Sequence, residues 1–441
     1  MRIALCLYPI DNWGGIINHV EDLAYGLRAI GHSMNLHMLV WQNSVVLQES
    51  DTTKFTKGQF GYYNQHRGWL PFPGFKIPYK GEDNLKRACD FLSAYDLIIW
   101  EIPVPTARKE NKGNTDWIKL YKACGKNIAM IHDGNLVEGY PWLYMVKDHL
   151  TGLACVHECA YGMAANLSLP RALLLNPQRL DKKYIFTPYE RRQCGFLSLQ
   201  TFKGWKHVDQ LVRAIPYIDY TVRKVLAGGG LEQQYMISKD KIKPEYLCRR
   251  KEDPNLPFEL EQRRTTIWNR ALAHNMEWLG YTTNRQRDKL LLELRCLVDP
   301  SWSIRYAKAG GHFNRTVIDA LKCGALPVAT RIGMEGFTGS NLFKEGVNYI
   351  GLDYDCTPSQ YASQVEQACN LPNRVASTII DNGRKLLARF ECKTVAQQFI
   401  DFATTARSYD TGREDSGKLV TKAYETYADF FMPKTNIRDF L

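Results

Sequence analysis

The sequence predicts an α/β protein made of two consecutive doubly wound domains, each a parallel sheet covered by helices on both faces. Short apolar runs alternate with amphipathic stretches, and a second cycle of this alternation begins near residue 194. This alternation is typical of parallel sheets, because parallel strands need a crossover connection, usually a helix. A chain of 441 residues is long enough for two or three such domains.

The first domain is expected at residues 1–185. Its strands are predicted at the short apolar runs 2–7, 35–41, 95–100, 127–131, 153–156 and 171–175. An amphipathic helix is predicted at 16–30, ending at Gly31 and His32, because glycine is favoured just after a helix. The segment 50–82 is rich in Gly, Pro, Tyr and Phe, which predicts a long loop or insertion.

The second domain is expected at residues 186–405, after a polar linker at 176–192. Its predicted strands lie at 194–199, 223–227, 277–280, 296–299 and 326–329, and its predicted helices at 208–215, 283–294 and 315–322. A charged block at 239–270 interrupts this order. Residues 406–441 are expected to form a helical tail, with a helix at 419–431, that packs back on the first domain.

Composition excludes several classes of protein. Aromatic residues make up 12% of the chain, too many for a disordered protein. No apolar run approaches the ~18 residues of a membrane-spanning helix, so no stable membrane insertion is expected. The first residues predict a buried strand rather than a secretion leader, and the 12 Cys are scattered singly, as reduced thiols are. We therefore expect a cytoplasmic protein, and we expect it to be a monomer.

Motifs of several enzyme classes are missing from the sequence. It contains no Gly-x-Ser-x-Gly elbow, no Gly-Lys-Ser/Thr phosphate loop and no His-Glu-x-x-His. The run 155–159 holds two Cys, a His and a Glu, but no second pair lies at zinc-finger spacing, so no metal site is predicted. The compositional anomaly is charge, since 57 Lys and Arg against 46 Asp and Glu give +11. This excess suggests a polyanionic partner without identifying it.

Two motifs of the first domain lie where a predicted strand ends. Gly14 and Gly15 join the first strand to the first helix, where backbone N–H groups can approach an anion. The alternative is a simple tight turn. His132 and Asp133 follow strand 127–131, a place suited to hydroxyl contact or general-base chemistry. Here the alternative is a packed histidine with a helix-capping aspartate.

The second domain carries two comparable segments. Lys203 follows strand 194–199 and can reach a diphosphate as a point charge, although most such lysines are simply solvated. The segment 308–315 brings glycines to a helix start, where N–H groups can bind phosphate. Asp319, on that helix, could accept hydrogen bonds from a ribose diol. The alternative is a plain helix start with a solvated Asp319.

Taken together, these segments resemble the retaining, nucleotide-sugar-dependent glycosyltransferases of the GT-B fold, from residue 1 to about residue 405. The anchors are 13–15, 31–32, 176–177, 202–204 and above all 319–328. The resemblance implies two Rossmann-like domains facing a cleft, with a UDP-sugar as co-substrate and no metal or other cofactor. It also implies that Lys203 holds the donor diphosphate and Asp319 the ribose. The sugar and phosphates would be held through the backbone of Gly310, Gly311, His312, Phe313 and Asn314.

Within this superfamily, segments 96–103 and 130–134 most resemble the bacteriophage DNA α-glucosyltransferases, which modify 5-hydroxymethylcytosine in duplex DNA. The resemblance implies that His132 faces the donor sugar and Asp133 the acceptor hydroxymethyl group, in the cytoplasm of a host cell. The chain departs from the family pattern at Gly311 and Ser198, where the family has Glu and Arg. We expect Arg305 and Lys308 to supply the missing positive charge on the diphosphate.

A DNA-modifying enzyme must grip phosphates and expose its target base. The candidate DNA-binding residues are Tyr62, His66, Arg67, Arg249, Arg250 and Lys251. A surface loop and a solvated charge run are the alternatives for these two groups. A bacterial cell-envelope polysaccharide glycosyltransferase and a non-catalytic nucleotide-binding protein remain the alternative functions. The sugar stays open between glucose and a pentose such as arabinose, and the acceptor between a hydroxymethylated pyrimidine and a sugar attached to it.

Overall fold

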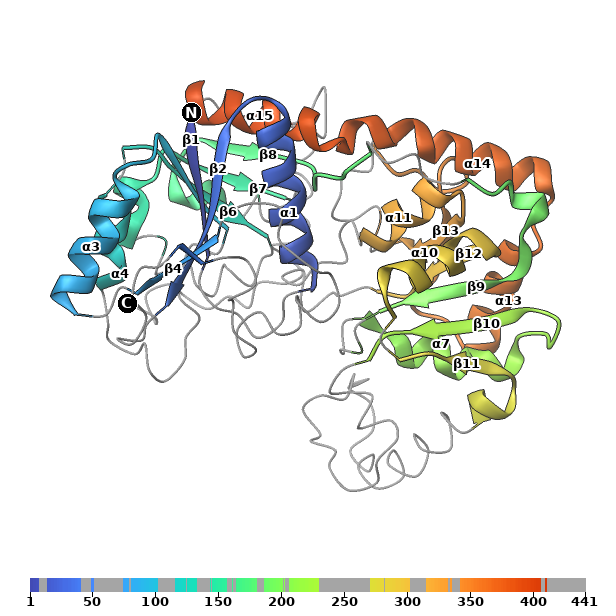
Figure 1. Cartoon of the computed structure of the whole chain (residues 1–441). Coiled ribbons are helices and arrows are strands. Elements are labelled where there is room, and N and C mark those ends of the chain that lie inside the picture. The colour runs from blue at the N-terminus through green and yellow to red at the C-terminus, as the bar shows by residue number, and fades with distance from the viewer. Residues whose placement is uncertain are drawn as a thin grey trace, which may run out of the picture. The chain divides into compact units, whose positions relative to one another are not determined.

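The computed structural model divides the chain into two compact units, Met1–Lys182 with Ala388–Leu441 and Lys183–Leu387 (Figure 1). The residues that the structure describes are 1–7, 14–40, 49–50, 74–78, 81–101, 116–123, 125–132, 143, 145–156, 161, 164–180, 186–200, 202, 206–229, 270–280, 282–301, 315–331, 334, 342–405 and 409–410. No helix within these ranges is long and apolar enough to cross a membrane.

The first unit is built on a nine-stranded sheet of order β15-β8-β7-β6-β5-β1-β2-β4-β3. Its strands are β1 (Arg2–Leu7), β2 (Ser33–Val40), β3 (Glu49–Ser50), β4 (Gly74–Pro78), β5 (Leu97–Trp100), β6 (Asn127–Ile131), β7 (Gly152–Cys155), β8 (Arg171–Leu173) and β15 (Tyr409–Asp410). Every pair is parallel except β3 with β4. The strand order reverses between β1 and β5, so the carboxyl ends of these strands form a topological switch point.

Helices and apolar strands form the core of the first unit. Its helices are α1 (Gly14–Ala29), α3 (Glu82–Leu92), α4 (Asp116–Tyr121) and α15 (Cys392–Thr405), with short 3₁₀ turns at Lys147–His149 and Ala164–Leu167. Strands β5, β6 and β7 are buried along their whole length, as expected for central parallel strands. Trp100 stacks on Tyr121 with ring centroids 4.0 Å apart, and its Nε1 donates to Asn127 Oδ1 at 3.0 Å. The end of β5 is therefore held rigidly against β6.

The second unit is a six-stranded, all-parallel sheet of order β11-β10-β9-β12-β13-β14. Its strands are β9 (Gln193–Leu199), β10 (Arg223–Ala227), β11 (Met276–Trp278), β12 (Leu294–Asp299), β13 (Leu326–Thr330) and β14 (Ile350–Leu352). Its helices are α7 (Val208–Ala214), α10 (Asn284–Glu293), α11 (Arg315–Cys323), α13 (Pro358–Cys369) and α14 (Asn373–Leu386), with 3₁₀ turns at Tyr189–Arg191 and Ile215–Tyr217. A third 3₁₀ turn, Leu387–Phe390, begins where the chain leaves this unit.

Helix starts of the second unit follow local sequence signals. Thr283 and Thr357 each accept a hydrogen bond from the N–H three residues on, and Gln286 and Gln360 bond back to the cap residue. These reciprocal bonds satisfy N–H groups that a helix start would otherwise leave unpaired. The sheet order reverses between β9 and β12, which gives this unit a switch point of its own.

The predicted fold class is confirmed, because both units are doubly wound α/β sheets. One expectation was wrong in detail. Strand β4 lies inside the segment 50–82 that the sequence predicted to be a loop or insertion, and it pairs in parallel with β2. A short run of mixed apolar and polar residues next to prolines gives a weak strand signal, and pairing with an existing sheet edge overrides it.

The boundary expected at residue 405 also differs from the division of the structure. Helix α15 belongs to the first unit, since the second unit ends at Leu387. The chain thus returns to the first unit at Ala388. Backbone hydrogen bonds hold it there, because the Gln178 N–H donates to Phe390 O at 2.6 Å and the Cys392 N–H donates to Gln178 O at 2.9 Å. In the tail, Tyr409 and Asp410 form β15 on β8. The helix expected at 419–431 lies outside the described residues.

The close contact between α1 and α15 predicts that a side chain larger than glycine at Gly26 lowers stability. A methyl group added there would overlap the backbone carbonyl of Cys392 on α15. Alanine inside a helix normally stabilises it by up to about 1 kcal/mol over glycine. We expect Gly26→Ala instead to lower the free energy of unfolding by about 1–3 kcal/mol, because overpacking forces the helices apart. Urea denaturation measures the change.

Gly125→Ala is the matched control, since Gly125 is exposed and a methyl group added there would meet open space. It is expected to leave the free energy of unfolding within about 0.5 kcal/mol of the parent value. A Gly26→Ala protein that is more stable than the parent would show that α15 does not pack on α1.

Candidate functional site

Two side chains meet at the carboxyl edge of the first sheet because their strands are neighbours. Glu101 directly follows β5 and His132 directly follows β6, and these strands pair in parallel. The backbone N–H of Glu101 donates to Cys6 O at 2.8 Å, which ties it to the end of β1. His19 comes to the same place from α1, the helix that follows β1. The cluster therefore lies at the switch point, where sheets of this kind bind their ligands.

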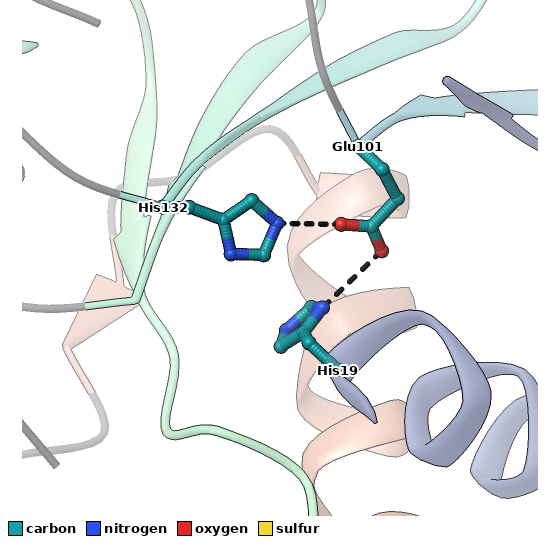
Figure 2. Close-up of side chains that lie close together, drawn as sticks. All are labelled: His19, Glu101 and His132. Carbon is teal, nitrogen blue, oxygen red and sulfur yellow. Dashed lines mark hydrogen bonds and ion pairs between the residues drawn. The ribbon is translucent and has the colours of Figure 1, made fainter. Parts of the chain in front are cut away.

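The two carboxylate oxygens of Glu101 each face one imidazole, that of His132 or that of His19 (Figure 2). His132 Nε2 lies 2.7 Å from Glu101 Oε2, and His19 Nδ1 lies 3.3 Å from Glu101 Oε1. The two rings are nearly perpendicular, at 86°, with centroids 4.7 Å apart. The side chain of Glu101 is 0% exposed, that of His19 4% and that of His132 10%. Of the three, His132 has the greatest access to solvent.

The charges of the cluster follow from burial and from these contacts. Burial alone would raise the pKa of Glu101, but the neighbouring His19 and His132 outweigh it and lower the pKa to about 2. Burial lowers the pKa of His19, and Glu101 opposes this shift only in part. Near neutral pH, Glu101 is a buried carboxylate and His19 is a neutral ring.

The same three side chains are a possible ligand set for a metal ion. Their donor atoms all lie within 4.8 Å of one another, and two imidazoles with a carboxylate suit zinc and related metals. The 2.7 Å separation between His132 and Glu101 is, however, that of a direct hydrogen bond. A cation bound by both would have to break this bond. The observed geometry is that of one direct hydrogen bond, between His132 and Glu101, with His19 Nδ1 lying 3.3 Å from the other carboxylate oxygen.

In the second unit, Asp319 is buried on α11 and is 7% exposed. Arg287 Nη1 lies 3.4 Å from one carboxylate oxygen, and Lys322 Nζ lies 3.5 Å from the other. Lys322 is itself 2% exposed. Asp319 is thus not the solvated side chain of the alternative interpretation, because two cations hold it in place.

A polar group also lies at the carboxyl edge of this sheet, and the sequence analysis assigned no role to its residues. Asp299, at the end of β12, accepts from Ser301 N–H at 3.0 Å and from the Thr316 hydroxyl at 3.3 Å. Thr330, at the end of β13, donates to Ser301 O at 2.6 Å. The Ser301 hydroxyl lies 3.4 Å from Gln200 Oε1, just after β9. Polar residues directly after adjacent parallel strands were the available signal.

A groove of the second unit lies away from this edge. Its lining residues are Thr187, Arg191, Gln193, Arg285, Asp288, Lys289, Leu292 and Glu293. Gln193 begins β9, so the groove lies at the amino ends of the strands. Sheets of this kind bind ligands at the opposite edge. We therefore do not count this groove as the functional site.

The residues predicted from the sequence fall into two groups. Gly14 and Gly15 are the first two residues of α1, His132 directly follows β6, and Asp319 lies on α11. The His132 ring contacts His19 of helix α1. Asp319 lies in the other unit. The remaining predicted residues lie outside the described ranges, and they are Asp133, Lys203, Arg305, Lys308, Gly310, Gly311, His312, Phe313, Asn314, Tyr62, His66, Arg67, Arg249, Arg250 and Lys251.

His19 and Glu101 are functional candidates that the sequence analysis assigned no role. Glu101 was visible as the first polar residue after an apolar run, and His19 as a histidine on an amphipathic helix. Each signal is common and carries little weight alone. Their pairing depends on the strand order, which brings residues 19, 101 and 132 together.

No protein-family model matches the sequence, and no curated protein is significantly similar to it. Solved structures nevertheless share its fold. HepE of Anabaena in complex with UDP and glucose is 14% identical, with a TM-score of 0.63, over 92% of this chain and 100% of that one.

An α-glucosyltransferase in complex with UDP and a 13-mer DNA is 11% identical, with a TM-score of 0.59, over 92% of this chain and 99% of that one. A TarM mutant of S. aureus, in complex with fondaparinux, α-GlcNAc-glycerol and UDP, is 10% identical with a TM-score of 0.61, over 92% and 100%. The chain has the GT-B fold, the two-domain Rossmann-like architecture of nucleotide-sugar-dependent glycosyltransferases.

The lowered pKa values in the cluster predict how stability depends on pH. The unfolded chain takes up protons at His19 below its ordinary value of 6.5, and at Glu101 below 4.5, before the folded protein does. The contribution of these two residues to the free energy of unfolding is therefore complete above pH 6.5. It falls as the pH drops through 6.5, and it falls again below pH 4.5. We expect His19→Asn, which keeps an N–H donor near Glu101, to reduce the loss of stability between pH 7 and pH 5.

Urea denaturation at pH 7, 6 and 5 measures this change. The contribution of His32, whose pKa burial also lowers, is present in parent and variant alike and cancels. His274→Asn, at an exposed position, is the matched control and should keep the parent slope. An unchanged slope in His19→Asn would contradict the proton assignment of the cluster.

Proposed function

We propose that this chain is a retaining glycosyltransferase that transfers a sugar from a UDP-sugar to an acceptor. The observation that carries the proposal is the similarity of 92% of the chain to the folds of HepE, the α-glucosyltransferase and TarM, all three solved with UDP. Polar side chains at the switch points of both sheets, Glu101 and His132 in the first and Asp299 in the second, support it.

The donor is assigned to the second unit. Lys203, Arg305 and Lys308 would stabilise the negative charge that develops on the departing diphosphate, where fixed charges are most effective. The backbone N–H groups of residues 310–314, and those of Gly14 and Gly15, would hold the phosphates and sugar. Asp319 would bind the ribose diol, oriented by its own contacts with Arg287 and Lys322. No metal is needed in this scheme.

The first unit would hold the acceptor and the sugar. His132 would contact the donor sugar, and Asp133 would orient the acceptor hydroxyl. The bond between the anomeric carbon and the β-phosphate oxygen breaks, and the acceptor oxygen bonds to the same face of that carbon. The acceptor proton passes to the departing phosphate oxygen, directly or through Asp133. This sequence retains the anomeric configuration without a covalent enzyme intermediate.

For the acceptor, we propose a hydroxymethylated pyrimidine in duplex DNA, or a sugar already attached to one, with glucose or a pentose such as arabinose as the transferred sugar. The net charge of +11 and the similarity to an α-glucosyltransferase solved with DNA support this assignment. Tyr62, His66 and Arg67 would approach the target base, and the residues Arg249, Arg250 and Lys251 would contact phosphates.

A bacterial cell-envelope acceptor is the second candidate. HepE, and the TarM mutant that was solved with α-GlcNAc-glycerol, are as similar in fold to this chain as the DNA-bound enzyme is. The two acceptors differ in how binding responds to salt. Contact with duplex DNA releases counterions, so it weakens steeply as salt rises, in proportion to the number of phosphates neutralised.

The deciding experiment measures UDP release and product formation with several UDP-sugars. The acceptors are duplex DNA with 5-hydroxymethylcytosine, the same duplex unmodified, and liposomes containing anionic lipid. Mass spectrometry of the digested nucleosides identifies the sugar and its attachment point. Release of UDP that does not rise with hydroxymethylated DNA would reject the DNA acceptor, and binding to liposomes without DNA would favour the second candidate.

Lys203 provides a test of the donor site that does not depend on the acceptor. We expect Lys203→Ala to lower kcat/KM by about 100- to 1,000-fold, because removing one group that stabilises transition-state charge has an effect of this size in other enzymes. UDP affinity, measured by calorimetry, should fall by about tenfold. Lys344→Ala, at an exposed position of the same unit, is the matched control and should change neither value. Equal UDP affinity in both variants would remove Lys203 from the donor site.

A further inference from the structure

We propose that Glu101 and His19 are positioning residues that hold the His132 ring in the tautomer with its proton on Nε2, leaving Nδ1 to accept a hydrogen bond from a substrate hydroxyl. This inference rests on the proposed function, in which His132 contacts the donor sugar. It adds the direction of that contact and the two residues that fix it.

The first step is the charge on Glu101. Its side chain is completely buried, and its pKa lies well below neutral. A buried carboxylate is tolerated only where donors face it. Among the described residues, the side chains that face its two oxygens are the imidazoles of His132 and His19.

The second step is the proton on His132. An ionised carboxylate can only accept, so the ring nitrogen 2.7 Å away must carry a hydrogen and donate it. In the neutral form of the imidazole this Nε2–H is the single N–H, which leaves Nδ1 of His132 as a bare acceptor. Figure 2 shows this second nitrogen on the side of the ring away from Glu101. A hydroxyl group is the natural partner for it.

The third step is the part played by His19. Its ring stands perpendicular to His132 at 4.7 Å, which limits rotation of the His132 ring. Burial keeps His19 neutral, so the charge of Glu101 is not cancelled and remains available to hold the N–H of His132. The part of His19 is therefore to pack against the His132 ring, while its Nδ1 lies 3.3 Å from the second oxygen of Glu101. Both residues act through His132 and need not touch the substrate.

The tautomer can be observed directly with the whole protein. Multiple-bond ¹H–¹⁵N spectra of a sample labelled with [¹⁵N]histidine distinguish protonated from bare ring nitrogens, and a His132→Gln sample identifies the His132 signals. We expect a bare Nδ1 and a protonated Nε2 in the parent, and a shift toward the opposite tautomer in Glu101→Gln. A protonated Nδ1 in the parent, or identical spectra in Glu101→Gln, would overturn the proposal.

Kinetics test whether the tautomer matters for transfer. Glu101→Gln keeps the shape but presents an amide, which cannot accept from both rings. We expect kcat to fall about 10- to 100-fold, with KM for the UDP-sugar within about threefold, as for partners that orient a functional histidine. Glu82→Gln, an exposed carboxylate on α3, is the matched control and should keep parent kinetics. Equal losses in kcat and in folded fraction would indicate a purely structural role.

His19 gives a second, independent test. His19→Asn keeps an N–H donor toward Glu101, whereas His19→Leu removes it, so we expect the Asn variant to retain at least about tenfold more activity. One equivalent of zinc in the purified parent, lost in His19→Leu, would overturn the hydrogen-bonded arrangement of His132 and Glu101 in favour of a metal centre. If the spectra show the expected tautomer but no UDP-sugar is turned over, the proposed function fails while the tautomer assignment stands.

Discussion

The buried carboxylate of Glu101 is the constraint on which the arrangement of the first sheet's carboxyl edge depends. An ionised group without solvent is tolerable only when donors surround it, and here His132 comes from the end of β6 and His19 from α1. These elements must therefore keep their relative positions for the fold to be stable. Losing one partner of a buried charge typically costs about 3–5 kcal/mol. Stability and the orientation of His132 thus depend on the same contacts.

The path of the chain secures the helix that carries His19. The polypeptide leaves the first unit after Gln178 and comes back beside it, where Gln178 and Glu391 form a β-bridge. Helix α15 follows directly and packs on α1, with Gly26 allowing the close approach. Arg179 adds ion pairs to Glu21 and Asp22 on α1. Helix α1 is therefore anchored by segments distant from it in sequence, which places His19 with precision.

The fold could be predicted from the sequence far better than the site. Apolar runs such as 127–131 predict the central strands because both faces of a parallel sheet are buried. Strand β4 was not predicted, because it forms by pairing with β2 and its composition gives little sign of a strand. Helix α15 was expected in the second domain because sequence order alone gives no sign that the chain crosses back. Glu101 and His19 were not predicted as site residues for a similar reason, since only the strand order brings residues so distant in sequence together.

Net charge alone does not locate a surface that could bind DNA. In the second unit Arg223 pairs with Glu277, Arg331 with Glu345 and Asp353, and Arg287 with Asp288 and Asp319. These cations neutralise nearby carboxylates and hold elements together, so they add little field at a distance. Such pairs cancel in the net charge, so the excess of +11 comes from other residues, and what matters for DNA binding is whether those residues lie together. Binding of DNA, as proposed, would need a local cluster of cations, and the run Arg249, Arg250 and Lys251 is the densest one that the sequence offers between residues 239 and 270.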